Sequence, residues 1–345
     1  MDTRDTAEQA ELRRAARQLA SELGPTTVAD LDDRTRTKRL ATAVRDAGWL
    51  ELRDDVGDGR PLAAGEEAAI VAEALGGAVA DVAFTGPVLA ADLARRAGTA
   101  PEGVAVVACT RALTGVAPSA PAVAVDCDGD IDGAYVVVPE GDHFRLATVR
   151  VDGARAGADL TRTLRAVSAE AASEPVGGGG HLLARDDLVR WNALGLALTS
   201  ADLVGVMRGL LDVTVAYASD RHQYGVPIGS FQAVQHLLAE AHTLFEGSVS
   251  VAQYASWGVD NLEPDAARSA GRVAKAYCAR AARTVCETAV QVHGGIGNTW
   301  DCMVHAYLRR ALLSTQWFGD DGEQIEQLEQ QRLGVPIGGR GDGLP

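Results

Sequence analysis

Groups suited to contacting a ligand are concentrated in one stretch of the sequence, residues 221–236. It reads Arg-His-Gln-Tyr-Gly-Val-Pro-Ile-Gly-Ser-Phe-Gln-Ala-Val-Gln-His. Its glycines and its proline interrupt apolar residues that recur at three- and four-residue steps on both sides, which is the pattern of two amphipathic helices. The stretch is therefore predicted to be a corner between two packed helices. Side chains at such a corner can face a neighbour or a ligand, and the polar and aromatic ones here are Arg221, Gln223, Tyr224, Phe231 and Gln232.

A second stretch, residues 291–300, reads Gln-Val-His-Gly-Gly-Ile-Gly-Asn-Thr-Trp. It ends a long helical pattern, so its glycines are first of all a helix stop. Glycines also let a ligand approach backbone N–H groups closely, which makes Gly294 and Gly295 candidate contact residues. The four glycines at 177–180 lack the residues that a phosphate loop requires, and we interpret them as a flexible link.

The elements that must position these stretches are mostly helical. Helices are predicted at 7–23, 38–49, 66–76 and 87–97, and short β-like runs at 104–108, 122–125, 134–138 and 144–151. Residues 186–335 return to helical spacing and predict a bundle of four to five helices. The expected fold is mainly α with a small central β domain. Its expected parts are an N-terminal helical domain at 1–103, a shortened middle β domain at 104–185, and a C-terminal four-helix-type bundle at 186–345.

Composition narrows the function classes. A formal net charge of −15 argues against nucleic acid or an anionic membrane surface as a partner. We read no apolar run approaching the roughly 18–20 residues of a membrane span, and the N-terminus lacks a secretory apolar region. The five cysteines have no metal-ligand spacing, so no metal site is expected. A reducing, cytoplasmic location fits this cysteine usage.

Both stretches closely resemble the acyl-CoA dehydrogenase family. The first matches its Arg-x-Gln-(Phe/Tyr)-Gly-x-Pro-Ile signature, the second its Gln-x-x-Gly-Gly segment, and residues 305–311 continue the match. The resemblance covers roughly residues 40–335, and it is dense after 195 and thin between 104 and 185. It implies α,β-dehydrogenation of an acyl-CoA or other acyl thioester, with FAD as hydride acceptor and an electron-accepting flavoprotein as partner. It also implies a homo-oligomer or a heterotetramer with a related chain, because in the family cofactor groups come from two chains.

The resemblance assigns roles to the candidate residues. In the family, the Gln-x-x-Gly-Gly segment lies along the FAD pyrophosphate and adenosine of a neighbouring subunit, and the corner meets the same cofactor from the opposing side. Arg221 would bond phosphate, which suits a guanidinium, and the two aromatic residues would line adenine or ribose. The implied cofactor-binding residues are Arg221, Gln223, Tyr224, Phe231, Gln232, Gln291, Gly294 and Gly295.

The catalytic base that the resemblance implies is missing. The family carries its glutamate, which removes the α-proton, at one of two positions. One lies about nine residues after an Arg-Asp-Ala segment matched here by Arg309-Arg-Ala311, and it holds Phe318. The other lies about ten residues before Gly205, and it holds Gly195. Asp202, one turn from Gly205, is the substitute base that the sequence offers.

The middle domain departs from the family as well. Family members that hold FAD in the usual way carry Thr-Glu-Pro and Gly-Ser-Asp segments on the first strands. Here residues 109–116 read Cys-Thr-Arg-Ala-Leu-Thr-Gly-Val, although the Asp-Leu-Thr-Arg at 159–162 resembles the end of that sheet in shorter members. The resemblance therefore leaves open whether FAD is bound by this chain, shared between subunits or lost.

Three functions follow from these observations. The first is an FAD-dependent acyl-CoA dehydrogenase with an unusual base. The second is a base-less partner subunit of a heteromeric acyl-CoA dehydrogenase, as in short actinobacterial members that degrade sterol side chains and related acyl-CoA substrates. The third is an enzyme or binding protein of the same fold that acts without redox chemistry on an acyl thioester or a natural-product intermediate.

Overall fold

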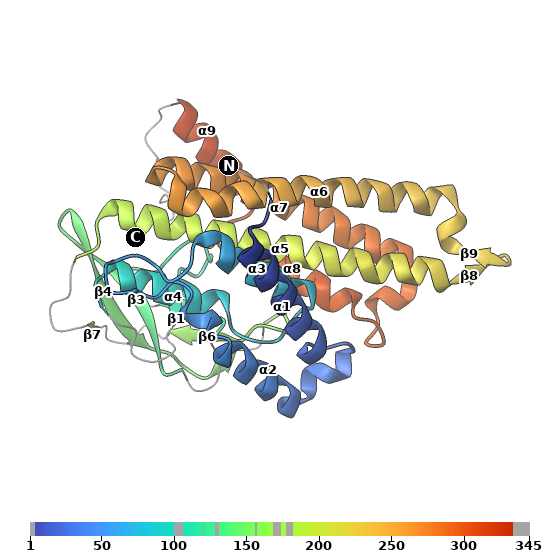
Figure 1. Cartoon of the computed structure of the whole chain (residues 1–345), viewed down its shortest axis with the longest axis horizontal. Coiled ribbons are helices and arrows are strands. Elements are labelled where there is room, and N and C mark those ends of the chain that lie inside the picture. The colour runs from blue at the N-terminus through green and yellow to red at the C-terminus, as the bar shows by residue number, and fades with distance from the viewer. Residues whose placement is uncertain are drawn as a thin grey trace.

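The computed structural model describes residues 4–99, 106–119, 121–127, 131–155, 157–167, 174–176 and 182–333. Helices precede and follow a group of strands along the chain (Figure 1). The mainly helical fold with a small central sheet is confirmed, while the domain boundaries at 103 and 185 remain a prediction. The N-terminal elements are α1 (Ala7–Leu23), η1 (Val28–Asp32), α2 (Arg34–Asp46), η2 (Trp49–Glu51), α3 (Gly65–Gly77) and α4 (Thr85–Arg96).

The middle of the chain forms a seven-stranded sheet in the order β5-β6-β2-β1-β3-β4-β7. Its longest pair is the antiparallel hairpin of β3 and β4, whereas β1 and β3 pair in parallel. The strands are β1 (Val106–Cys109), β2 (Ala122–Val125), β3 (Gly133–Glu140), β4 (His143–Arg150), β5 (Ala154–Arg155), β6 (Leu164–Val167) and β7 (Glu174–Pro175).

The C-terminal region is a bundle built around α5 (Arg185–Asp220), which runs from the sheet to the far end of the molecule (Figure 1). Against expectation, α5 contains a stretch that could span a membrane by length and composition, but 89% of it is buried inside the protein. Its apolarity thus belongs to a core helix. The other elements are β8 (His222–Gln223), β9 (Val226–Pro227), η3 (Ile228–Ser230), α6 (Gln232–Asn261), α7 (Pro264–His293), η4 (Gly294–Asn298), α8 (Val304–Gln316) and α9 (Asp321–Leu333).

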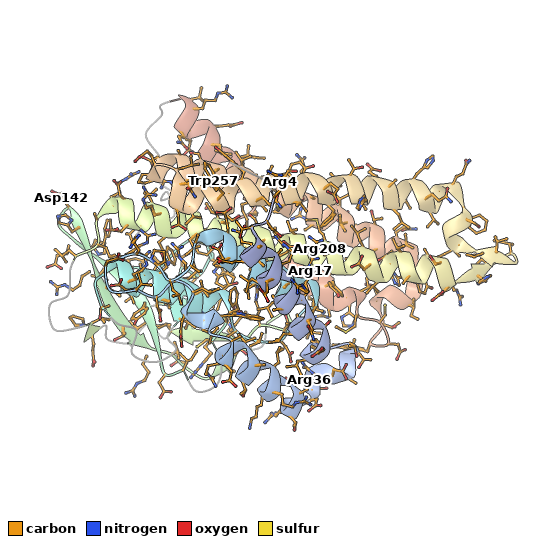
Figure 2. All side chains as sticks on the ribbon, viewed as in Figure 1. Arg4, Arg17, Arg36, Asp142, Arg208 and Trp257 are labelled. Atoms are coloured by element: carbon orange, nitrogen blue, oxygen red, sulfur yellow. The ribbon has the colours of Figure 1, made fainter. Side chains whose placement is uncertain are left out.

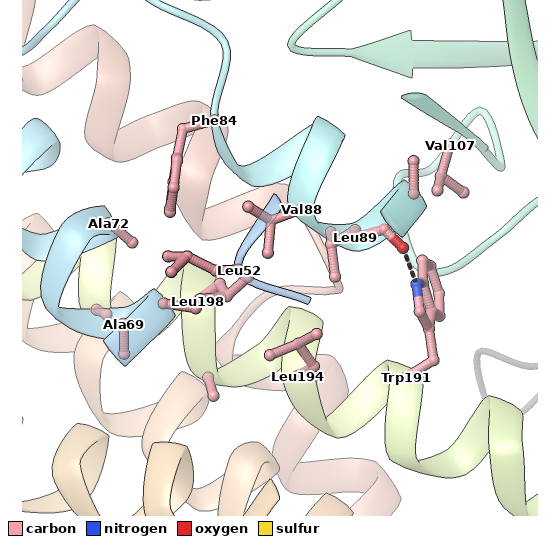
Figure 3. Packing of buried hydrophobic residues seen from close by; sticks show 14 of the residues in the cluster. Leu52, Ala69, Ala72, Phe84, Val88, Leu89, Val107, Trp191, Leu194 and Leu198 are labelled. Atoms are coloured by element: carbon pink, nitrogen blue, oxygen red, sulfur yellow. Dashed lines mark hydrogen bonds between the residues drawn. The ribbon is translucent and has the colours of Figure 1, made fainter. Parts of the chain in front are cut away.

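The first half of α5 is held by close packing against α4 (Figure 3). Trp191 is fully buried, and its indole N–H donates to the Leu89 carbonyl at 2.9 Å. Val88 and Leu89 of α4 and Leu194 of α5 are also at most 1% exposed. Apolar burial of this kind stabilises by roughly 25 cal/mol per Å². The residues around Trp191 therefore have a fixed position.

Glycines let α3 and α5 pack with their backbones in contact. A Cβ atom added at Gly205 would lie 2.0 Å from the Glu73 carbonyl oxygen, and one at Gly209 would lie 2.0 Å from the Gly77 carbonyl oxygen. Real Cβ atoms do not come so close to an oxygen, so only glycine fits these two positions.

Candidate functional site

The two positions where the family carries its base lie in contact. A Cβ added at Gly195 would lie 2.1 Å from the tip of the Phe318 ring, so the aromatic ring fills the space above the glycine. Trp191 borders the ring with its centroid 5.4 Å away, and Trp317 with its centroid 6.1 Å away. The three aromatic residues are at most 2% exposed. We call this group, with Leu113, the closed centre.

The loop after β1 covers the closed centre from the sheet side. The backbone N–H of Phe318 donates to the Leu113 carbonyl at 2.7 Å. Both residues have positive φ, 62° at Leu113 and 69° at Phe318, which is uncommon for bulky side chains. Strain of this kind persists only where the surroundings determine the conformation, and it clusters at functional sites. Leu113 lies in the segment that replaces the flavin-contacting strands of the family, and Phe318 occupies one of the family's two base positions. The strained pair therefore joins these two segments by a direct hydrogen bond.

Asp202 is fully buried beside two arginines. Its Oδ1 lies 2.7 Å from Arg310 and 3.0 Å from Arg162, and Ser314 Oγ donates to its Oδ2 at 2.6 Å. Burial alone would raise the pKa of Asp202, but the two arginines outweigh it and hold the pKa below its ordinary value. A paired carboxylate of low pKa is a weak proton acceptor, so this geometry favours a structural role over the role of base.

The ion pairs of Asp202 connect the N-terminal helices, the sheet and the C-terminal bundle. Arg162, before β6, also lies 3.3 Å from Asp126, after β2. Arg310 of α8 donates to the Ala80 carbonyl, before α4, and to the Thr161 hydroxyl. The network was missed from the sequence, although a signal existed. Arg310 stands where the family's Arg-Asp-Ala segment has aspartate, and a buried arginine requires a carboxylate partner, which Asp202 supplies.

The residues predicted at the corner lie at the end of the molecule opposite the sheet (Figure 1). β8 and β9 form a two-residue turn there, with φ of 52° at Tyr224 and 84° at Gly225. Tyr224 is 96% exposed, and its ring meets Phe231 edge-on at 6.4 Å between centroids. Arg221 is exposed as well and has no side-chain ion pair within the described part of the chain.

The glycine turn lies at the same end as the corner. Tyr217, one turn before Arg221, stacks on His293 at 4.3 Å between ring centroids, and this contact joins the ends of α5 and α7. Gly294 has a φ of 64°, and a Cβ added at Gly294 or Gly295 would meet nothing within 4 Å. The structure thus brings the two predicted stretches to one end of the bundle. The Tyr217–His293 stack that joins them was not predicted.

The C-terminal part matches a known protein family. Residues 193–333 match the model of the acyl-CoA dehydrogenase C-terminal domain. The chain is 37% identical over 134 residues to the acyl-CoA dehydrogenase IpdE2 of Mycolicibacterium smegmatis, an alignment that spans 39% of this chain and 41% of that protein. IpdE2 of Mycobacterium tuberculosis is 28% identical over 277 residues, which span 77% of this chain and 83% of the relative.

Solved structures extend the likeness to the whole fold. A chain of the Tcur3481-Tcur3483 steroid ACAD is similar with a TM-score of 0.80 at 21% identity, over 95% of this chain and 98% of that one. A chain of the ChsE4-ChsE5 complex from Mycobacterium tuberculosis gives a TM-score of 0.77 at 23% identity, over 98% and 100%. Residues 193–333 thus match the C-terminal domain of the acyl-CoA dehydrogenase family, and the chain as a whole shares the fold of these solved structures.

Proposed function

We propose that this chain is the base-less subunit of a heteromeric acyl-CoA dehydrogenase. Part of its surface contacts an FAD that is bound mainly by a related chain. The observation that carries the proposal is the Phe318 ring packed on Gly195. Neither of the family's two base positions, 195 and 318, holds a carboxylate. The Phe318 ring fills the space that a glutamate side chain at position 195 would need.

The residues of this chain fit the pyrophosphate part of FAD but not its flavin ring. At the corner, Arg221 is exposed and its side chain forms no ion pair with any residue that the structure describes, and the backbone at Gly294 and Gly295 is open to a ligand. These groups suit a pyrophosphate that approaches from outside. The flavin ring does not fit the closed centre, because Leu113 and Phe318 are hydrogen-bonded there.

The corner and the closed centre are too far apart to form one compact site. The helix α5 runs between Gly195 and Arg221, and that length corresponds to about 39 Å at the usual rise per residue. The corner residues project from the end of the bundle, away from the sheet (Figure 1). A cofactor that meets the corner therefore belongs to another chain.

Two of the structural relatives support a related chain as partner. The Tcur3481-Tcur3483 and ChsE4-ChsE5 assemblies each contain two different proteins, and the first is a steroid ACAD. By analogy, the assembly would dehydrogenate an acyl-CoA, and a bulky, steroid-like acyl group is one candidate substrate class. FAD, when bound, accepts the hydride. The part of this chain is to hold phosphate through Arg221 and to cover the nucleotide with Tyr224 and Phe231.

The proposal is tested by counting flavin in the visible absorption spectrum. The chain purified alone should be colourless, and the chain co-purified with a related acyl-CoA dehydrogenase subunit that carries the base glutamate should hold about one FAD per pair of chains. Arg221→Ala should lower the flavin content of the pair while the helical circular dichroism is unchanged. Arg60→Ala, which alters an arginine exposed to 80% on the N-terminal part, is the matched control.

Two outcomes would overturn the proposal. About one FAD per chain in the protein purified alone, with dehydrogenase activity, would establish a self-sufficient enzyme. Colourless protein that no related subunit converts to a flavoprotein would favour the third function, without redox chemistry.

A further inference from the structure

A cavity of about 700 Å³ lies between α1, α3, α5, η4 and α8. It is separate from the closed centre, because about 25 Å of α5 lie between Gly195 and Asp212 in the cavity wall. Pockets for small molecules in proteins commonly measure about 300–1,000 Å³. The cavity therefore has the volume of a ligand pocket.

Small residues make the floor of this cavity. It is lined by Ala20 of α1, by Ala74, Gly77 and Ala78 at the end of α3, and by Gly209 of α5. The backbones of α3 and α5 touch here, so no larger side chain fits on the floor at position 209. The space is thus a consequence of helix packing, and the surrounding elements hold it open.

The wall toward η4 is aromatic. The stacked pair of Tyr217 and His293 faces the cavity, and Tyr307 lines it with its hydroxyl engaged by the Gly77 carbonyl at 2.9 Å. Burial lowers the pKa of His293, so the ring is neutral at physiological pH. Flat uncharged surfaces of this kind suit an apolar ligand.

Both arginines of the lining are paired with Glu73. Arg208 lies 2.5 Å and Arg17 lies 3.2 Å from Glu73, and the two arginines project from α5 and α1 toward one another (Figure 2). The remaining charged residues of the lining, Asp212 and Asp301, are acidic and repel an anion. Arg208 Nε is buried and has no hydrogen-bond acceptor in the part of the chain that the structure describes. The rest of the guanidinium lines the cavity and can donate a hydrogen bond to a ligand oxygen.

We infer that this cavity binds a neutral, mainly apolar small molecule whose carbonyl or hydroxyl oxygen accepts a hydrogen bond from the Arg208 guanidinium in the lining. The inference rests on the cavity alone and holds whether or not the proposed function is correct. The occupant lies between the small-residue floor and the Tyr217–His293 wall, with its oxygen directed to α5.

Fluorescence titration of the full chain with the neutral probe N-phenyl-1-naphthylamine tests the site. One molecule should bind per chain, and Val213→Trp, at a partly exposed position of the lining, should weaken binding roughly tenfold or more by filling the cavity. Val215→Trp, on the same helix but outside the lining, is the control and should bind as the unaltered protein does. Equal affinity in both variants, or no binding at all, would overturn the inference. Ser21→Trp fills the cavity from α1 and serves if Val213→Trp fails to fold.

Displacement of the same probe tests the ligand class. 2-Decanone should displace it at a roughly tenfold lower concentration than decanoate, which has the same length and a negative charge. Arg208→Met should weaken displacement by 2-decanone several-fold, because it removes the guanidinium donor from the lining. Equal displacement by both compounds in the unaltered protein would overturn the assignment of a neutral ligand.

Discussion

At the scale of single residues, the structure gives Asp202 a different role from the one that the sequence suggested. The sequence offered it as the candidate base, and the structure gives it two arginine partners instead. Breaking one side of a buried ion pair leaves the other charges unpaired, which is costly.

We therefore expect Asp202→Asn to lower the free energy of unfolding by about 3–5 kcal/mol. Urea denaturation measures the change, and Asp212→Asn, on the exposed side of the same helix, is the control with an expected effect within about 0.5 kcal/mol. Unchanged stability, together with lost turnover in the assembled protein, would restore Asp202 as the base.

Lys275 gives the protein a pH dependence of stability. Its ammonium is fully buried and donates to the carbonyls of Ser314 and Trp317, and burial lowers its pKa to about 7. The unfolded chain keeps this proton up to about pH 10.5 and the folded protein loses it above about pH 7, so the unfolded state binds more protons between these values.

The free energy of unfolding should therefore rise with pH between about 7 and 10, by an amount on the order of 1 kcal/mol per pH unit at most. Lys275→Met removes the group, and urea denaturation at pH 7, 8 and 9 should show a flatter profile for the variant. Parallel profiles would show that Lys275 stays protonated in the fold.

At the scale of elements, the sequence predicts more of the helices than of their contacts. The apolar spacing places α1 at its observed bounds, whereas α2 begins at Arg34, four residues before the prediction, because Asp33 caps it. The parallel pairing of β1 with β3 was not foreseen, since pairing depends on residues distant in the chain. For the same reason, the sequence identified positions 195 and 318 separately but gave no sign that they touch.

The contact between α3 and α5 gives an element-scale prediction in which two effects oppose each other. Gly205→Ala would favour the helix by up to about 1 kcal/mol through propensity alone. Its Cβ would press on the Glu73 carbonyl, so we expect a net loss of about 1–3 kcal/mol in the free energy of unfolding. Gly153→Ala, where nothing lies within 4 Å, is the control. A stabilised Gly205→Ala protein would mean that the two helices separate without cost.

At the scale of the whole molecule, the residues exposed at the corner are not explained by a contribution to the stability of the fold. The turn of β8 and β9 requires positive φ at both central residues, a place for asparagine or glycine, yet it holds a tyrosine that is 96% exposed. A strained and exposed aromatic residue indicates a role in contacting another molecule.

Tyr224→Gly distinguishes a role of Tyr224 in stability from a role in contacting the cofactor. It relieves the backbone, so the melting temperature of the chain alone should stay the same or rise slightly. The flavin content of the assembled pair of chains should fall, because the nucleotide loses its aromatic contact. An unaltered flavin content in the pair would show that Tyr224 takes no part in holding the cofactor.

The closed centre also bears on how such a chain could change over evolutionary time. Phe318→Glu would bury a carboxylate among Trp191 and Trp317, at a backbone position already strained for a side chain. Gly195→Glu would drive its first carbon into the Phe318 ring. Neither single step yields a working base, and each passes through a less stable protein. A base could therefore return to this chain only if positions 195 and 318 changed together.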